Sequence, residues 1–158
     1  MIKKQLFKNY ITENIDNAYR FAYSYVRNRE DAEDIVSESV IKALKSVDKL
    51  KNTGKIKPWF YRIIANTSID FINSRNRIIK SDLSEADKVI KTEDDYSRLT
   101  VDSIIESLDE KYKMIVILRF CEDMTIKEIG KVLNINENTV KTRLYSAMKQ
   151  LEIEMEDM

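Results

Sequence analysis

The chain has 158 residues, of which 43% are hydrophobic and 34% charged, with no histidine, one cysteine, two glycines and one proline. The missing histidine excludes imidazole acid-base catalysis and histidine-ligated metal sites, and a single cysteine excludes a disulfide within the chain. With so few turn formers and enough apolar residues for a core, the sequence favours a globular, all-α fold.

Charge is segregated along the chain, although the 27 basic and 27 acidic side chains cancel overall. Residues 1–77 carry 15 basic and 9 acidic side chains, residues 78–110 carry 4 and 10, and residues 111–158 carry 8 and 8. Such blocks are typical of a protein with a surface for a polyanion and an acidic connector. No apolar run approaches the roughly 20 residues that cross a bilayer, and the polar start is unlike a signal peptide, so we expect a soluble, cytoplasmic protein.

Two helices are expected first. The first covers about Tyr10 to Arg27, ends at the polar break Arg27-Asn28-Arg29, and repeats apolar residues at helical spacing, namely Ile11, Ile15, Ala18, Ala22 and Val26. The second opens with four acidic residues that suit the positive end of a helix dipole, Glu30, Asp31, Glu33 and Asp34. Its apolar face comprises Ala32, Val36, Ala43 and Val47.

A basic loop from Asp48 to Lys57 leads to a third helix, which begins at Pro58 and ends near Arg75. Its apolar side includes Trp59, Phe60, Ile63, Ile64, Thr67 and Phe71, and its polar stripe comprises Arg62, Asn66, Asp70, Asn73 and Arg77. A stripe alone is most simply a solvated face. The aromatic cluster Trp59-Phe60-Tyr61 beside a basic loop instead suits unpaired bases and their backbone, although we expect Trp59 and Phe60 to pack the core.

Between residues 78 and 100 acidic residues dominate, which predicts a solvated linker with a short helix near Leu83 to Ile90. Three helices before it form a first compact domain, residues 1–77, and the returning apolar periodicity marks a second, residues 101–158. Cys121 follows the apolar stretch from Met114 to Phe120, so we expect a thiol in the core.

A helix-turn-helix is predicted from Thr125 to Leu151. Thr125 and Glu128 have the spacing of a capping box, and Gly130 lies where a small residue is needed. Asn134 suits a left-handed turn position and Asn136 can cap the next helix. That second helix has an apolar face of Val140, Leu144, Ala147 and Leu151.

The opposite face of the second helix is polar and basic, a mixture able to reach phosphates and base edges in a major groove. It carries Asn138, Lys141, Thr142, Arg143, Tyr145 and Lys149. A helical hairpin with an ordinary solvated face is the alternative, because such patterns also arise by chance. Five basic and two acidic residues between Thr125 and Leu151 predict weak DNA affinity in isolation.

The whole sequence resembles bacterial sigma factors of the extracytoplasmic-function class, which keep only the second and fourth sigma regions. The resemblance lies in three motifs in order, Asp31-Ala32-Glu33-Asp34-Ile35-Val36-Ser37-Glu38-Ser39, Pro58-Trp59-Phe60-Tyr61-Arg62-Ile63-Ile64-Ala65-Asn66 and Asn138-Thr139-Val140-Lys141-Thr142-Arg143-Leu144. Within the class, Arg20 to Asn28 and Ile56 to Tyr61 look most like the sigma-V type of low-GC Gram-positive bacteria.

The resemblance implies roles for matching positions. It implies that Asp34, Ser37 and Glu38 dock on the clamp helices of the polymerase largest subunit. It also implies contact between the chain and the polymerase flap, for which no residues are assigned. It implies that the −10 element is melted and held by Lys55, Lys57, Arg62, Asn66, Asn73 and Arg77. It implies that the −35 element is read by Asn138, Lys141, Thr142, Arg143 and Tyr145, with Lys149 on phosphate. Departures from the family pattern are Ser37 in place of a common glutamine, and Ser146 and Met148 in place of arginines.

The implied partners are core RNA polymerase, promoter DNA and an anti-sigma factor anchored in the membrane, which would hold the protein at its inner face. A sigma-V-type factor implies a cell-envelope stress signal such as lysozyme. No catalytic residue, metal, cofactor or small-molecule substrate is implied.

Two other functions remain open from the residues themselves. One is a conventional helix-turn-helix regulator that acts without polymerase and dimerises through its first half. The other is a helical enzyme with metal ligands among Glu30 to Glu38, which fits poorly because no second carboxylate cluster lies on another helix of that domain.

Overall fold

The computed structural model describes residues 2–82 and 108–156, and these residues form helices and turns without any strand. The chain divides into two compact units, Met1–Asp95 and Tyr96–Met158. The expectation of an all-α protein is confirmed. The predicted short helix near Leu83 to Ile90, and almost all of the predicted linker, lie outside the described residues.

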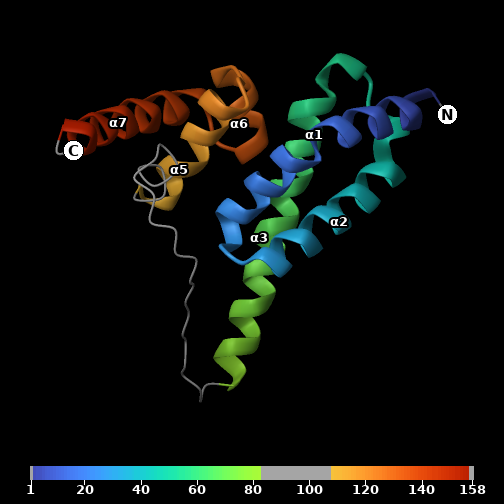
Figure 1. Cartoon of the computed structure of the whole chain (residues 1–158), viewed down its shortest axis with the longest axis horizontal. Coiled ribbons are helices and arrows are strands. Elements are labelled where there is room, and N and C mark those ends of the chain that lie inside the picture. The colour runs from blue at the N-terminus through green and yellow to red at the C-terminus, as the bar shows by residue number, and fades with distance from the viewer. Residues whose placement is uncertain (1, 83–107, 157–158) are drawn as a thin grey trace. The chain divides into compact units, whose positions relative to one another are not determined.

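Three helices build the first unit, α1 (Ile2–Val26), α2 (Arg29–Ser46) and α3 (Ile56–Asp82), and each packs on the other two (Figure 1). Two short 3₁₀ turns, η1 (Val47–Lys49) and η2 (Thr53–Lys55), connect α2 to α3. The core is aromatic: Phe7 lies with its ring centroid 5.1 Å from that of Phe60, and Phe21 lies 5.0 Å from Tyr61. Burial of these large rings is the main stabilisation of the unit.

The helix boundaries in the first unit differ from the expected ones. The first helix begins at Ile2 rather than Tyr10, because Phe7 is buried against α3, and it has a non-helical residue at Asn14 (φ −122°, ψ 16°). Ile15, which directly follows that kink, is exposed instead of buried. The third helix begins at Ile56 and continues to Asp82, beyond the predicted end near Arg75.

Local signals set the junction of α1 and α2 as predicted. The first helix ends at Val26, and Arg27 has a left-handed backbone (φ 55°). The Asn28 side chain then caps α2 by accepting a hydrogen bond of 2.8 Å from the backbone N–H of Asp31.

The second unit contains α5 (Glu110–Val116), a π-helical turn η3 (Ile117–Cys121), α6 (Ile126–Leu133) and α7 (Glu137–Glu156). Its core includes Ile115, Leu118, Met124, Ile129, Val140 and Ala147. The prediction that Cys121 is a core residue is wrong, since Cys121 is exposed and the neighbouring Phe120 is 57% exposed. A π turn holds an extra residue and rotates the following side chains away from the face that a regular helix would bury.

Candidate functional site

The first candidate surface lies on α2. Asp34, Ser37 and Glu38 are all exposed and lie three or four residues apart, so they occupy one face of the helix. A carboxylate oxygen of Glu38 lies 3.4 Å from the Lys42 amine, and that amine also lies 3.1 Å from the Thr67 hydroxyl oxygen on α3.

An apolar residue completes the face on α2. Ile41 follows Asp34 by seven residues and Glu38 by three, and it is 54% exposed. The isoleucine adds one exposed apolar side chain to this otherwise polar face. Sequence reasoning missed Ile41, because a helical periodicity count cannot tell an exposed isoleucine from one at the edge of the core.

The second candidate surface combines the loop before α3 with the polar stripe on α3. The stripe is real: Asn66, Asp70, Asn73 and Arg77 are exposed and Arg62 is half-buried. Lys55 is exposed and Lys57 half-buried at the start of the helix. Ile69, which is also exposed, joins the stripe and was missed by sequence reasoning.

Hydrogen bonds hold the loop in shape. The Lys3 amine donates to the backbone oxygens of Leu50 (2.7 Å) and Asp48 (3.2 Å), so the start of α1 anchors the end of η1. The Asn52 side chain accepts a hydrogen bond of 2.9 Å from the backbone N–H of Gly54. The basic residues after Gly54 therefore follow an anchored backbone.

The aromatic residues beside this loop face inward. Phe60 and Tyr61 are fully buried, and Trp59 is half-buried with its ring edge-on to Phe7 at 6.0 Å. The expectation that Phe60 packs the core is confirmed. The suggestion that the whole cluster suits unpaired bases is wrong for Phe60 and Tyr61, whose rings are inaccessible.

An ion pair joins α2 and α3 of the first unit. The Arg75 guanidinium on α3 binds the Asp31 carboxylate near the start of α2, and it also lies 5.1 Å from the centroid of the Phe71 ring. Both contacts of Arg75 are thus with residues of the first unit, and Arg75 does not belong to the exposed stripe.

The turn between α6 and α7 is formed as the sequence predicts. Thr125 and Glu128 make both hydrogen bonds of the capping box, at 3.1 and 3.0 Å. Asn134 is left-handed (φ 60°, ψ 47°), and the N–H of Ile135 donates to the oxygen of Gly130 at 3.0 Å. A Cβ at Gly130 would lie 2.9 Å from the backbone oxygen of Ile135, so the small residue is required by the turn itself.

The third candidate surface is on α7. The Asn136 side chain accepts a hydrogen bond of 3.0 Å from the N–H of Thr139 at the start of the helix, as predicted. Tyr145 is 66% exposed, and the Lys149 amine lies 5.6 Å from the centroid of its ring. The exposed predicted residues on this helix are Asn138, Lys141, Thr142, Tyr145 and Lys149.

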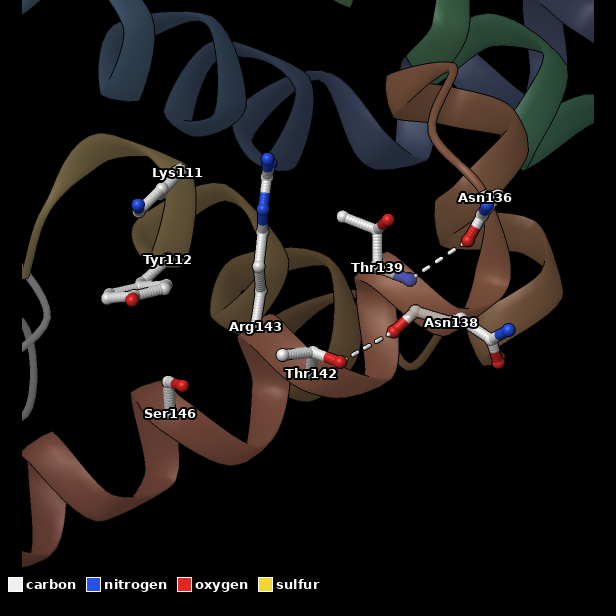
Figure 2. A pocket seen from close by; sticks show the side chains of 8 residues that line it. All are labelled: Lys111, Tyr112, Asn136, Asn138, Thr139, Thr142, Arg143 and Ser146. Atoms are coloured by element: carbon white, nitrogen blue, oxygen red, sulfur yellow. Dashed lines mark hydrogen bonds between the residues drawn. The ribbon is translucent and has the colours of Figure 1, made fainter.

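Arg143 differs from the other predicted residues of α7, because it is half-buried and lines a pocket against α5. The pocket has a volume of about 390 Å³, and Figure 2 shows the side chains around it. They are Lys111 and Tyr112 from α5, and Asn136, Asn138, Thr139, Thr142, Arg143 and Ser146 around the start of α7. Sequence reasoning missed Lys111 and Tyr112, because nothing local indicates that they lie beside α7.

The described residues also limit other kinds of site. Among the helices that the structure describes, none has a stretch long and apolar enough to span a membrane. Within residues 2–82 and 108–156, no three acidic or cysteine side chains gather in a way that could hold a metal ion.

Comparison with known proteins identifies both halves of the chain. A family model for Sigma-70 region 2 matches residues 10–78, and one for Sigma-70, region 4 matches residues 98–151. The RNA polymerase sigma factor SigV of Bacillus subtilis (strain 168) is 43% identical over 96% of this chain and 92% of its own length. The ECF RNA polymerase sigma factor SigW of the same organism is 27% identical over 90% of this chain and 85% of its own length.

A solved structure has the same fold. The sigma factor RpoE of Bartonella quintana, in a complex with the anti-sigma factor NepR, matches with a TM-score of 0.76 at 20% identity, and the match covers 95% of this chain and 96% of that chain.

The chain belongs to the sigma-70 family of RNA polymerase sigma factors, in its extracytoplasmic-function group. As a member it binds core RNA polymerase and directs promoter-specific transcription initiation, and it is an initiation factor rather than an enzyme. The identity to SigV agrees with the sigma-V-type motifs of the sequence. The region 2 match decides against a conventional regulator that acts without polymerase.

Proposed function

We propose that the exposed face of α2 is the surface that docks on the clamp helices of the polymerase largest subunit. Asp34, Ser37 and Glu38 supply its polar contacts, and Ile41 supplies an apolar one. The observation that carries this assignment is their common exposure on one helix face. Burial of one apolar side chain among charge-assisted contacts is a common pattern in protein interfaces.

The loop before α3 and the polar stripe of α3 hold the −10 element in this proposal. Cations and amides spaced along one exposed helix face can follow the backbone of a single strand and hydrogen-bond to unpaired bases. The residues assigned to this role are Lys55, Lys57, Arg62, Asn66, Asn73 and Arg77.

The exposed face of α7 reads the −35 element in the major groove. Asn138, Thr142 and Tyr145 face the base edges, while Lys141 and Lys149 contact phosphates. Residues 1–77 and 101–158 then act as two separate promoter readers joined by the linker 78–100. Polymerase holds both readers, so two weak DNA contacts act at high effective concentration.

Regulation in this proposal depends on an anti-sigma factor. RpoE of Bartonella quintana is bound to such a factor, NepR, and this chain has the same fold. This supports an anti-sigma factor as a partner of the chain. The resemblance to sigma-V-type factors, with 43% identity to SigV, further implies that this partner is anchored in the membrane and releases the chain on cell-envelope stress.

Run-off transcription tests the central function. Purified core polymerase is given genomic promoter fragments with and without the chain. We expect defined transcripts that appear only when the chain is present. Failure to stimulate any promoter, under conditions where another sigma factor activates the same core, would contradict the function.

A charge reversal tests the docking surface. Glu38→Lys should weaken binding to core polymerase at least about tenfold, because a cation replaces an interfacial carboxylate. Glu13→Lys is the matched control, since it makes the same charge change at an exposed position of α1. Equal core affinity of the two variants, measured by fluorescence anisotropy, would remove Glu38 from the interface.

A further inference from the structure

We propose that the pocket between α5 and α7 binds one backbone phosphate of duplex DNA, held between Lys111 and Arg143. The inference rests on the proposed function of α7 as the reader of the −35 element. It extends the DNA surface to α5, outside the helix-turn-helix, and it gives Arg143 a phosphate rather than a base as its partner.

The side chains that line the pocket are suited to binding an anion. Its eight residues include two cations, Lys111 and Arg143, and no carboxylate. The other side chains are hydroxyls, amides and a phenol, which can donate hydrogen bonds, although the Thr142 hydroxyl already donates to the backbone oxygen of Asn138. Figure 2 shows the Arg143 side chain extended on the side of α7 where Lys111 and Tyr112 lie.

The two cations have complementary roles. A guanidinium offers a planar pair of donors that matches two phosphate oxygens, whereas an ammonium acts as a point charge. Arg143 is half-buried, so its position is restrained before DNA binds, and Lys111 is exposed at the start of α5. A volume of about 390 Å³ leaves room for a phosphate group with water beside it.

The position of Arg143 around α7 separates it from the base-reading face. Successive residues of an α-helix are rotated by roughly 100°, so Arg143 points about 100° away from Thr142, one of the residues proposed to read base edges. Tyr145 is 66% exposed, whereas Arg143 lies at the flank of the helix beside α5. When Thr142 faces the base edges, Arg143 points to the side of the groove, where the phosphates lie.

The test uses holoenzyme assembled from core polymerase and the full chain. The probes are a promoter duplex found by run-off transcription and a library of the same duplex randomised over the −35 element. Binding is measured over a series of KCl concentrations, and bound library members are sequenced. Lys111→Gln and Arg143→Gln remove the two cations singly and together.

We expect each single variant to weaken binding about tenfold, which is the effect of one charge-assisted hydrogen bond. The slope of log affinity against log salt should fall by about 0.9, and the preferred −35 sequence should stay the same. The double variant should lose little more than either single one, because both cations hold the same phosphate. Arg143→Lys should restore most of the salt slope.

Two variants calibrate the assay. Lys8→Gln removes the same charge from an exposed position of α1 and should leave the slope unchanged. Tyr145→Ala should alter the preferred sequence. Helicity measured by circular dichroism verifies that each variant is folded.

Three results would overturn the phosphate site while leaving the sigma-factor function intact. They are an unchanged salt slope in Lys111→Gln, a changed base preference in Arg143→Gln, and a loss of core affinity instead of DNA affinity. The last would assign the pocket to a carboxylate of a protein partner. Wild-type holoenzyme that selects no sequence would instead contradict the proposed role of α7.

Discussion

Replacing Gly130 by alanine adds a single methyl group and so tests the geometry of the turn between α6 and α7. In an ordinary helix interior, replacing glycine by alanine stabilises by about 1 kcal/mol. Here the added Cβ would lie 2.9 Å from the backbone oxygen of Ile135, closer than nonbonded atoms approach. To relieve this contact Ile135 must move, and the hydrogen bond from its N–H to the Gly130 oxygen would then weaken. Overpacking costs about 1–3 kcal/mol and a weakened hydrogen bond about 1 more, so the net loss is about 1–3 kcal/mol.

Thermal unfolding of the full chain measures this loss. For a unit of this size each kcal/mol shifts the Tm by about 4–8 °C, so Gly130→Ala should lower the circular dichroism transition of the second unit by at least about 4 °C. Trp59, the single tryptophan, reports on the first unit and should unfold as in the wild type.

Gly54→Ala is the matched control, at the only other glycine of the chain. Its Cβ would meet only the Asn52 side-chain oxygen at 3.2 Å, which can move, so the change should lie within about 0.5 kcal/mol. A higher Tm for Gly130→Ala would mean that helix propensity outweighs the contact with Ile135, and the reasoning would be refuted.

Three further changes test the fold. Thr125→Ala removes the capping hydroxyl and should destabilise the second unit by about 1 kcal/mol in urea unfolding followed by circular dichroism. No loss would show that water satisfies the Glu128 N–H as well as the threonine hydroxyl does. Phe7→Ala should cost about 3–5 kcal/mol, seen in Trp59 fluorescence, because the ring is fully buried; a loss below 1 kcal/mol would contradict its place in the core. Asp31→Asn breaks the pair with Arg75, whose side chain is 48% exposed, so the loss should stay below about 1 kcal/mol and shrink in 1 M salt. A loss that is independent of salt would rule out an ionic origin.

Features with short-range causes were predictable. The capping box at Thr125, the left-handed Asn134 and the polar break at Asn28 each depend on residues within four positions, so the sequence contains all the information. The exposed polar stripe of α3 was predictable for the same reason. Its spacing alone places it on one side of a helix.

Features that depend on packing between elements were not predictable. The start of α1 at Ile2 depends on Phe7 meeting α3, and the exposure of Cys121 depends on one π turn. The half-burial of Arg143 beside α5 could not be read from the spacing of the residues on α7. In each case the exposure of a residue depends either on a neighbour distant in the sequence or on a turn that changes the helical register.

The sequence by itself determined the helical class and the helix-turn-helix, because local hydrogen bonding and periodicity encode them. Its three motifs added the resemblance to the family, which rests on similarity and not on periodicity. Only the tertiary structure decided which of those residues face solvent. Ile41 and Lys111 became candidates, and Tyr61 proved to be as fully buried as Phe60, because burial is set by what packs on a helix and not by its own sequence.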